Sequence, residues 1–303
     1  MSLFLNDKHE LRPGWKFALY ILFFFILWIT AGVALSLIVS ERVLYEVQLA
    51  VLALNAVALL VPAVGAMWLS VKFIDHRPYS TFGIGFLPRW QPEFLFGLLL
   101  AAGMVALMIG GCFALGYVSI QWTGRQVSPV VLGSTFGLLL LSAVNEELVF
   151  RGFPLQILID AIGERPAIIG MSTLFGAVHL SNNNASILGI VNTIAAGVLL
   201  SLAYVRTRSL WMPYAIHVGW NVGLGFVFGV PLSGYDLPSL WTTGIAGSET
   251  ILGGGYGPEG GLLATFIFGS AALIVEKHGS NNRTKAGSGG HTRRSYRSGT
   301  GDS

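Results

Sequence analysis

NEELVFR, at residues 145–151, places two carboxylates and one guanidinium in a sequence that is otherwise almost free of charge. Long apolar runs flank this stretch on both sides, so a helix through it would span a bilayer. On such a helix Glu147 and Arg151 are four residues apart and therefore neighbours, whereas Glu146 points about 100° away from Glu147. Glu147 is then neutralised by Arg151, and Glu146 faces another part of the molecule.

These buried charges need a physical reason, because an ionisable group inside the hydrocarbon costs at least about 2.5 to 3.5 kcal/mol by insertion scales. Glu147 and Arg151 can offset each other as an ion pair, but Glu146 has no partner within its own helix. A carboxylate shielded from bulk water can accept the proton of a water molecule that attacks a carbonyl group. We therefore predict that Glu146 is a catalytic base.

The composition is that of a membrane protein. Of 303 residues, 53% are hydrophobic and 11% are charged, whereas soluble domains carry about 25% charged residues. Mean hydropathy is +0.67. The single cysteine, Cys112, excludes an intrachain disulfide and a metal site built from several cysteines. The net charge of +3 does not indicate nucleic-acid binding, because the basic residues flank apolar runs and form no stripe.

The apolar runs predict an all-α, polytopic membrane protein with about eight transmembrane helices. The expected spans are 17–40, 47–71, 94–118, 130–158, 166–180, 185–205, 210–230 and 262–275. Three parts follow: residues 1–129 with the first three helices, a core at 130–276 with the others, and a disordered basic tail at 277–303. The Gly-rich segment 231–261 lacks periodicity and is either a long external loop or partly re-entrant.

The distribution of Lys and Arg predicts the orientation. With eight spans, nearly all basic residues lie on the side of the two termini, while Arg42 and Arg125 lie on the opposite side and Arg151 lies within the membrane. We therefore expect both termini in the cytoplasm. The expected location is a bacterial cytoplasmic membrane, where the lipid bilayer is the surrounding partner.

Polar residues inside the other predicted spans are of the types that a hydrolase uses beside a general base. His179 lies near the end of the fifth span, and His217 and Asn221 lie four apart on one face of the seventh. Neutral histidines and an asparagine amide can donate hydrogen bonds to the oxyanion that forms when water attacks a carbonyl. Each residue alone has a plainer interpretation as a packing or helix-bridging group, which we also expect of Asn55 and Asn192.

Three motifs, in order, carry a family resemblance: EExxxR at 146–151, FxxxH at 175–179 and HxxxN at 217–221. The chain resembles the CAAX protease and bacteriocin-processing family, which includes type II CAAX prenyl endopeptidases, the ABI group and lysostaphin-resistance proteins. The resemblance covers about residues 130–275. GGGYGPEGG, at 253–261, is similar to a stretch that recurs in bacterial members, which is a softer match.

The resemblance implies an eight-helix intramembrane endopeptidase that acts on a peptide or a membrane-anchored protein. Glu146 would be the general base, and Glu147 with Arg151 the supporting ion pair. His179 would help to hold the water, and His217 with Asn221 would stabilise the oxyanion. No cofactor is required in this interpretation. Zinc is the alternative, held by Glu146, His179 and His217, although the usual His-Glu-x-x-His helix is absent from the sequence.

Two other classes of function also bury such residues. A proton-coupled transporter would place glutamate, histidine and arginine across several helices, but it usually shows two related halves, and no internal repeat is evident. A non-catalytic immunity or scaffold protein would keep the motifs as structure. Replacement of Glu146 by glutamine separates these alternatives, because a protease loses cleavage whereas a scaffold keeps its function.

Overall fold

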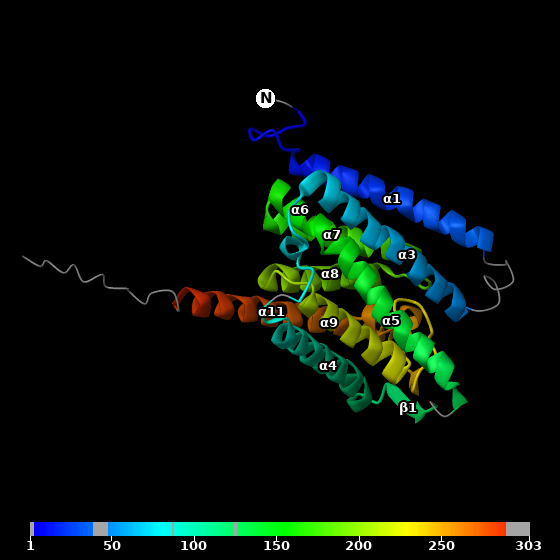
Figure 1. Ribbon diagram of the computed structural model, residues 1–303. Helices are drawn as coiled ribbons and strands as arrows, with labels where there is room; N and C mark the ends of the chain where they lie inside the picture. The colour runs from blue at the N-terminus through cyan, green and yellow to red at the C-terminus, as the bar shows by residue number, and fades with distance from the viewer. Residues whose placement is uncertain (1–2, 39–47, 87, 124–125, 289–303) are drawn as a thin grey trace, which may run out of the picture.

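The computed structural model describes residues 3–38, 48–86, 88–123 and 126–288. These residues form a bundle of helices that lie largely alongside one another (Figure 1). The helices are α1 (Pro13–Ile38), α3 (Gln48–Ser70), α4 (Trp90–Ala114), α5 (Pro129–Phe150), α6 (Phe153–Ile162), α7 (Glu164–Val178), α8 (Ile187–Thr207), α9 (Trp211–Asn221), α10 (Glu249–Leu252) and α11 (Leu262–Ser288). The predicted all-α membrane fold is confirmed.

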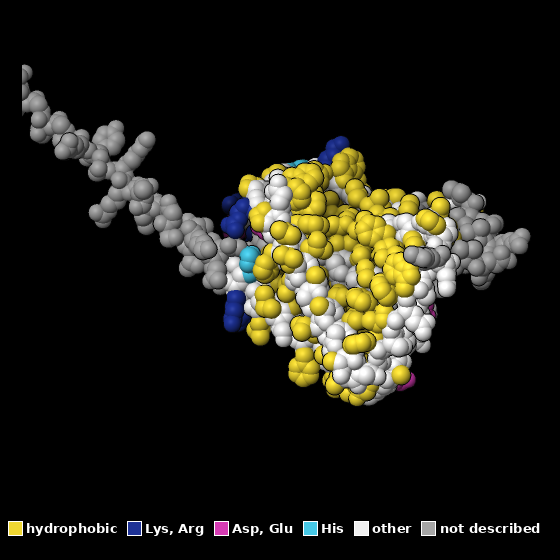
Figure 2. Space-filling model, turned by 90° about the horizontal axis from the view of Figure 1, so that it is seen from below, with side chains coloured by type: hydrophobic (Ala, Val, Ile, Leu, Met, Phe, Trp, Pro, Cys, Tyr) yellow, Lys and Arg dark blue, Asp and Glu magenta, His cyan; other side chains and the backbone are white. Residues whose placement is uncertain are grey.

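The surface of the bundle suits a lipid environment. Six stretches in the described residues are long and apolar enough to cross a membrane, and they contain α1, α3, α4, α5 with α6, α8 and α11. The face in Figure 2 is covered mostly by hydrophobic side chains, and most of the visible Lys and Arg side chains lie at its left end. Leu99 and Leu107 of α4 are among the exposed apolar residues. The protein is therefore an integral multi-pass membrane protein.

Two of the eight predicted spans are short helices. Helix α7 has 15 residues and α9 has 11, continued by a π-helix of 7 residues at Val222–Phe228, so neither is among the six long stretches. Helix α1 begins and α11 ends at the same end of the bundle (Figure 1), as an even number of crossings requires. The count of eight and the cytoplasmic side of the termini stay predictions.

Two predicted spans end earlier than expected. The span predicted at 130–158 is broken at Gly152, where α5 ends and α6 begins. Pro154 lies in the first turn of α6, where its missing N–H is tolerated, whereas inside one continuous helix it would remove a hydrogen bond. The span predicted at 94–118 ends at Ala114, and a strand, β1 (Val118–Trp122), follows.

Strand β1 pairs with a strand from the Gly-rich segment. β2 (Trp241–Ile245) runs antiparallel to β1, with Val118 opposite Ile245 and Trp122 opposite Trp241. The segment 231–261 also buries Leu252 and Tyr256 in the protein. It is therefore folded onto the helices. The choice between an external loop and a partly re-entrant segment stays a prediction.

The predicted tail also begins later than expected. Helix α11 continues to Ser288, so residues 277–288 are helical where the sequence predicted disorder. Residues 289–303 lie outside the described part of the chain, as do the connection with Arg42 and the position of Arg125.

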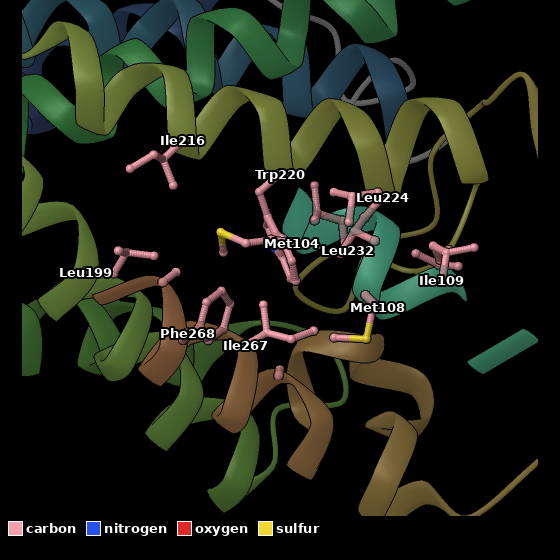
Figure 3. Packing of buried hydrophobic residues seen from close by; sticks show 14 of the residues in the cluster. Met104, Met108, Ile109, Leu199, Ile216, Trp220, Leu224, Leu232, Ile267 and Phe268 are labelled. Atoms are coloured by element: carbon pink, nitrogen blue, oxygen red, sulfur yellow. The ribbon is translucent and has the colours of Figure 1, made fainter. Parts of the chain in front are cut away.

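The core that supports the site lies between α4, α8, α9 and α11. Met104, Met108, Leu199, Trp220 and Phe268 are buried together there (Figure 3). The Trp220 and Phe268 rings lie 5.0 Å apart between their centroids, so these two side chains connect α9 to α11. This cluster fixes the helix that carries His217 and Asn221.

Helices α4 and α9 approach closely because a glycine lies at their contact. A Cβ atom at Gly97 would lie 2.7 Å from the backbone oxygen of Met212, whereas a Cβ at Gly103, also on α4, meets nothing within 4 Å. We expect Gly97→Ala to destabilise the protein by about 1 to 3 kcal/mol through overpacking. Gly103→Ala is the matched control and should be neutral or stabilising by up to about 1 kcal/mol, because alanine favours helix. Thermal unfolding in detergent measures both, and equal effects would contradict the close contact.

Candidate active site

Helix α5 turns its two adjacent glutamates toward different surroundings. The Glu147 side chain is 2% exposed and lies inside the protein, whereas the Glu146 side chain is 26% exposed. Arg151 follows the last residue of α5, and its Nη1 donates to Glu147 Oε1 at 3.1 Å. The ion pair predicted from the spacing of four residues is present, and Glu146 is the glutamate left free of it.

Arg151 is held from three sides. Besides Glu147, its Nη2 donates to the backbone oxygen of Gly197 at 3.5 Å, and its guanidinium lies 4.3 Å from the centre of the Phe175 ring. The side chain is almost completely buried. Arg151 therefore links α5 to α7 and α8 and is not available to a substrate.

His217 of α9 lies between the two glutamates. Its Nδ1 is 2.8 Å from Glu147 Oε1, and its Nε2 is 3.7 Å from Glu146 Oε2. One oxygen of Glu147 thus serves both Arg151 and His217, while the other oxygen has no hydrogen-bond partner among the described residues. The sequence placed these groups on separate helices; the fold brings them together.

His179 approaches from the end of α7. The helix ends at Val178, and the His179 Nδ1 lies 2.7 Å from the backbone oxygen of Phe175 in the last turn. The Phe175 ring is 4.7 Å from the His179 ring and 6.3 Å from the His217 ring, centre to centre. Phe175 thus contacts both imidazoles, which gives the first residue of the FxxxH motif a packing role.

One cavity of about 900 Å³ collects the predicted site residues. Glu146, His179, His217 and Asn221 all line it, whereas Glu147 and Arg151 lie behind its wall. Apolar residues of α1 and α3 extend the cavity away from these groups; they are Phe24, Phe25, Trp28, Gly32, Leu35, Leu52, Ala56, Ala58 and Leu59. The three motifs therefore converge on a shared space, as predicted.

The hydrogen bonds limit what neutral histidines can do. A carboxylate and a backbone carbonyl only accept hydrogen bonds, so Nδ1 of His217 and Nδ1 of His179 each carry the proton. In the neutral form each Nε2 then has a lone pair and can accept a hydrogen bond but not donate one. The expectation that neutral histidines donate to an oxyanion therefore does not fit; a doubly protonated imidazole or the Asn221 amide can do so.

A third carboxylate lines the cavity, and the sequence analysis did not assign it to the site. Glu259 Oε1 accepts from Trp220 Nε1 at 2.7 Å, and its Oε2 accepts from the backbone nitrogen and the hydroxyl of Ser233 at 2.7 and 2.8 Å. Its segment shows no periodicity and is predicted to be either an external loop or partly re-entrant, so the sequence pattern gives Glu259 no position among the spans. The signal that could have found Glu259 is its position inside the GGGYGPEGG stretch.

The two asparagines without a motif have different surroundings. Asn192 donates to the backbone oxygens of Glu259 and Gly261, both at 2.8 Å, and accepts from Thr265 at 2.7 Å, so it bridges α8 to the loop and to α11 as expected. Asn55 lines the cavity.

The residues do not fit the zinc alternative in this arrangement. Within residues 3–288, apart from their undescribed gaps, no three His, Cys, Asp or Glu side chains are grouped closely enough to hold a metal ion. Zinc binding by Glu146, His179 and His217 stays an untested prediction.

A known protein family matches the part of the chain that contains the three motifs. Residues 128–223 match the family model described as type II CAAX prenyl endopeptidase Rce1-like. Over this segment the chain is similar to the CAAX protease family. The match contains all three motifs and the helices from α5 through α9, so it covers Glu146, His179, His217 and Asn221. No curated protein matches the chain.

The family match supports peptide hydrolysis as the class of reaction. The matched family is one of CAAX-type intramembrane proteases, and it supports a peptide or a membrane protein as the class of substrate. Helices α1, α3 and α4 and the segment 231–261 lie outside the matched residues. The apolar arm of the cavity and Glu259 are therefore features for which this family match supplies no role.

Proposed function

We propose that this protein is an intramembrane endopeptidase in which Glu146 activates water against a peptide carbonyl. The observation that carries the proposal is the placement of the Glu146 carboxylate 3.7 Å from His217 Nε2, on a cavity that His179 and Asn221 also line. General base catalysis by a positioned carboxylate contributes typically about 10²- to 10⁴-fold in rate.

The reaction balances with water alone. The water oxygen forms a bond to the carbonyl carbon while Glu146 takes one of its protons, and the carbonyl oxygen becomes an oxyanion. The carbon–nitrogen bond then breaks, and the proton on Glu146 passes to the leaving amine. The products are a carboxylic acid, which then gives its proton to the new amine to leave a carboxylate and an ammonium group, and Glu146 is ionised again.

The remaining side chains fit supporting roles. His179 Nε2, with a lone pair in the neutral form, accepts a hydrogen bond from the attacking water. The Asn221 amide donates to the oxyanion. His217 donates as well when it is doubly protonated, a state in which Glu146, Glu147, Arg151 and His217 together carry no net charge. Loss of one such donor costs about 2.7 to 4 kcal/mol of transition-state stabilisation in other hydrolases.

A membrane-anchored substrate is favoured by the shape of the cavity. Its apolar arm reaches Phe25 and Trp28 of α1, which are 47% and 49% exposed. An apolar segment could therefore enter from the bilayer and lie between α1 and α5 with its peptide bond near Glu146. The proposed substrate is a peptide or a membrane-anchored protein.

The direct test compares membranes that contain the wild type with membranes that contain Glu146→Ala. Mass spectrometry of membrane peptides should reveal cleaved products that depend on Glu146, and their ends identify the bond. Identical peptide sets would contradict the protease assignment. In that case pH-dependent uptake of a solute would favour a proton-coupled transporter.

Gly32 tests the role of the apolar arm. It lines the cavity, and a Cβ at this position meets nothing within 4 Å, so a larger side chain can project into the arm without displacing a neighbour. We expect Gly32→Trp to lower cleavage of a substrate with a bulky apolar segment by about tenfold, mainly through KM. Gly14→Trp is the control, because Gly14 is also on α1 with open space but does not line the cavity. Equal activity of the two variants would remove the arm from the binding site.

A further inference from the structure

A buried hydrogen-bond cluster attaches the Gly-rich segment 231–261 to α9. Glu259 Oε1 accepts from Trp220 Nε1 at 2.7 Å, and its Oε2 accepts from the backbone nitrogen and the hydroxyl of Ser233 at 2.7 and 2.8 Å. The indole and the backbone N–H can only donate, so the two sides of this contact require an acceptor at both oxygens, which a carboxylate supplies. Hydrogen bonds to an ionised group are roughly twice as strong as neutral ones.

The backbone of Glu259 is fixed as well. Asn192 of α8, which is fully buried, donates to the backbone oxygens of Glu259 and Gly261, both at 2.8 Å. Thr265 of α11 donates in turn to the Asn192 amide oxygen at 2.7 Å. Two helices therefore hold the chain at Glu259, and its side chain presents an acceptor of fixed position to Trp220.

Trp220 is held on two sides. Its N–H donates to Glu259, and its ring lies 5.0 Å from the ring of Phe268 of α11, centre to centre. The residue is buried, so water cannot replace the carboxylate as the partner of the indole. The next residue along α9 is Asn221, the proposed donor to the oxyanion.

The position of Asn221 in its helix makes it sensitive to this contact. Helix α9 ends at Asn221, and the π-helix Val222–Phe228 follows. Such helices are rare and are frequent at functional sites, and here the α-helical hydrogen-bond pattern does not continue beyond Asn221. His217, one turn earlier, has an attachment of its own, because its Nδ1 lies 2.8 Å from Glu147 Oε1. The direction of the Asn221 side chain therefore depends on the residue beside it, Trp220.

We propose that Glu259 is a positioning residue for the reaction: through Trp220 it holds Asn221 so that the side-chain amide is directed at the oxyanion. The inference rests on the proposed function, in which the Asn221 amide donates to that oxyanion. Glu259 then acts on the turnover step and not on the affinity for substrate. A displacement of about 1 Å in a positioned group can lower a rate by about 10²-fold, so loss of this contact is measurable in kcat.

The kinetics of Glu259→Gln test the role. Glutamine has one acceptor oxygen, which Ser233 retains because it offers two donors, so the amide nitrogen faces the Trp220 N–H and that bond is lost. The probe is a fluorogenic peptide that spans a bond cut in wild-type but not in Glu146→Ala membranes, with the full-length protein in liposomes. We expect kcat to fall about tenfold while KM stays within about twofold of the wild type. An unchanged kcat, or an effect on KM alone, would overturn the inference.

A double-variant cycle distinguishes positioning of Asn221 from a general loss of structure. Asn221→Ala should lower kcat by about 10²- to 10³-fold, as loss of an oxyanion donor does in other hydrolases. If Glu259 acts through Asn221, adding Glu259→Gln to Asn221→Ala should lower kcat by less than about twofold more, because the group that it positions is already gone. A further fall of about tenfold would mean that the two residues act independently and would overturn the inference.

Failure of the proposed function gives a different result in the same experiment. No cleavage by the wild type, or an Asn221→Ala variant with wild-type kcat, would contradict the oxyanion role of Asn221 and remove the inference with it. A large effect of Asn221→Ala without any effect of Glu259→Gln would leave the proposed function in place and overturn the positioning role alone.

Two other changes in the same loop serve as comparisons. Asp236→Asn removes a charge from an exposed residue that does not line the cavity, so kcat should be unchanged. Ser233→Ala removes the hydroxyl donor but keeps the contact between Glu259 and Trp220, so kcat should fall clearly less than in Glu259→Gln. An equal fall in Ser233→Ala would assign the effect to attachment of the loop and overturn the role of the Trp220 contact.

Trp220→Phe gives an independent measurement if Glu259→Gln does not fold. It removes the N–H that Glu259 accepts and keeps an aromatic ring beside Phe268. The fall in kcat should match that of Glu259→Gln, and it should likewise disappear when Asn221 is already alanine. A Trp220→Phe protein with wild-type kcat would overturn the inference.

Discussion

Replacement of Glu146 by glutamine is expected to lower the rate of peptide cleavage by at least about 10²-fold while the protein stays folded. Glutamine has nearly the same shape but cannot take a proton from water, so the loss measures general base catalysis, which contributes about 10²- to 10⁴-fold. The Glu146 side chain is partly exposed and lies 3.7 Å from His217. Loss of its negative charge should therefore change the free energy of unfolding by less than about 1 kcal/mol. Single-turnover cleavage and thermal unfolding in the same detergent give both values.

Glu249→Gln is the matched control for this variant. Glu249 is exposed at the start of α10 and does not line the cavity, so the same chemical change there should leave cleavage within about twofold of the wild type. A Glu146→Gln protein that keeps more than about a tenth of wild-type activity would remove Glu146 as the base. The same two variants distinguish a scaffold or immunity role. Such a role requires the fold and not proton transfer by Glu146, so both variants would keep it.

The sequence predicted the membrane fold and the convergent motifs for a clear reason. Hydrophobic runs of roughly 20 residues are set by bilayer thickness and are read directly from composition. Glu146, His179 and His217 stood out because ionisable residues are rare in such runs, and the i,i+4 spacing indicated the Glu147–Arg151 pair. These properties are local, so they could be inferred without a structure.

Other features depend on distant contacts and could not be predicted in the same way. The break at Gly152 is an exception, because Pro154 is a local signal for it, but the run is apolar on both sides and hydropathy alone does not reveal the break. Strand β1 forms because β2 reaches it from more than a hundred residues away. Glu259 is buried only because Trp220 and Ser233 supply donors. In the sequence it is an acid among glycines.

The contact between His217 and Glu147 has a further consequence that the motif spacing did not reveal. The motifs assign these residues to separate roles, one in the ion pair and one at the oxyanion. In the structure Glu147 Oε1 lies 2.8 Å from His217 Nδ1 and 3.1 Å from Arg151 Nη1. Glu147, held by Arg151, therefore also keeps the proton of neutral His217 on Nδ1. As a result the Nε2 atom that faces Glu146 has a lone pair and accepts hydrogen bonds.

Arg151→Ala is accordingly expected to destabilise the protein by about 3 to 5 kcal/mol, because it leaves Glu147 as a buried charge with a weakened set of partners. The side chain is 1% exposed, and so water cannot replace the guanidinium without local unfolding. Thermal or denaturant unfolding in detergent measures the effect. Arg165→Ala removes an exposed arginine from the first turn of α7, so as the control it should change stability by no more than about 0.5 kcal/mol.

The double variant Glu147→Gln with Arg151→Met tests separately what the ion pair contributes to stability and what Glu147 contributes to the position of the proton on His217. It removes both charges together, so it should recover most of the stability lost in Arg151→Ala, as replacement of whole buried ion pairs does in other proteins. Activity should not recover, because the introduced glutamine presents either a neutral oxygen or an amide to His217 Nδ1 and no longer fixes its proton there. Full recovery of both stability and cleavage would mean that Glu147 and Arg151 act on the fold alone. Recovered stability with lost cleavage would place the pair in control of His217.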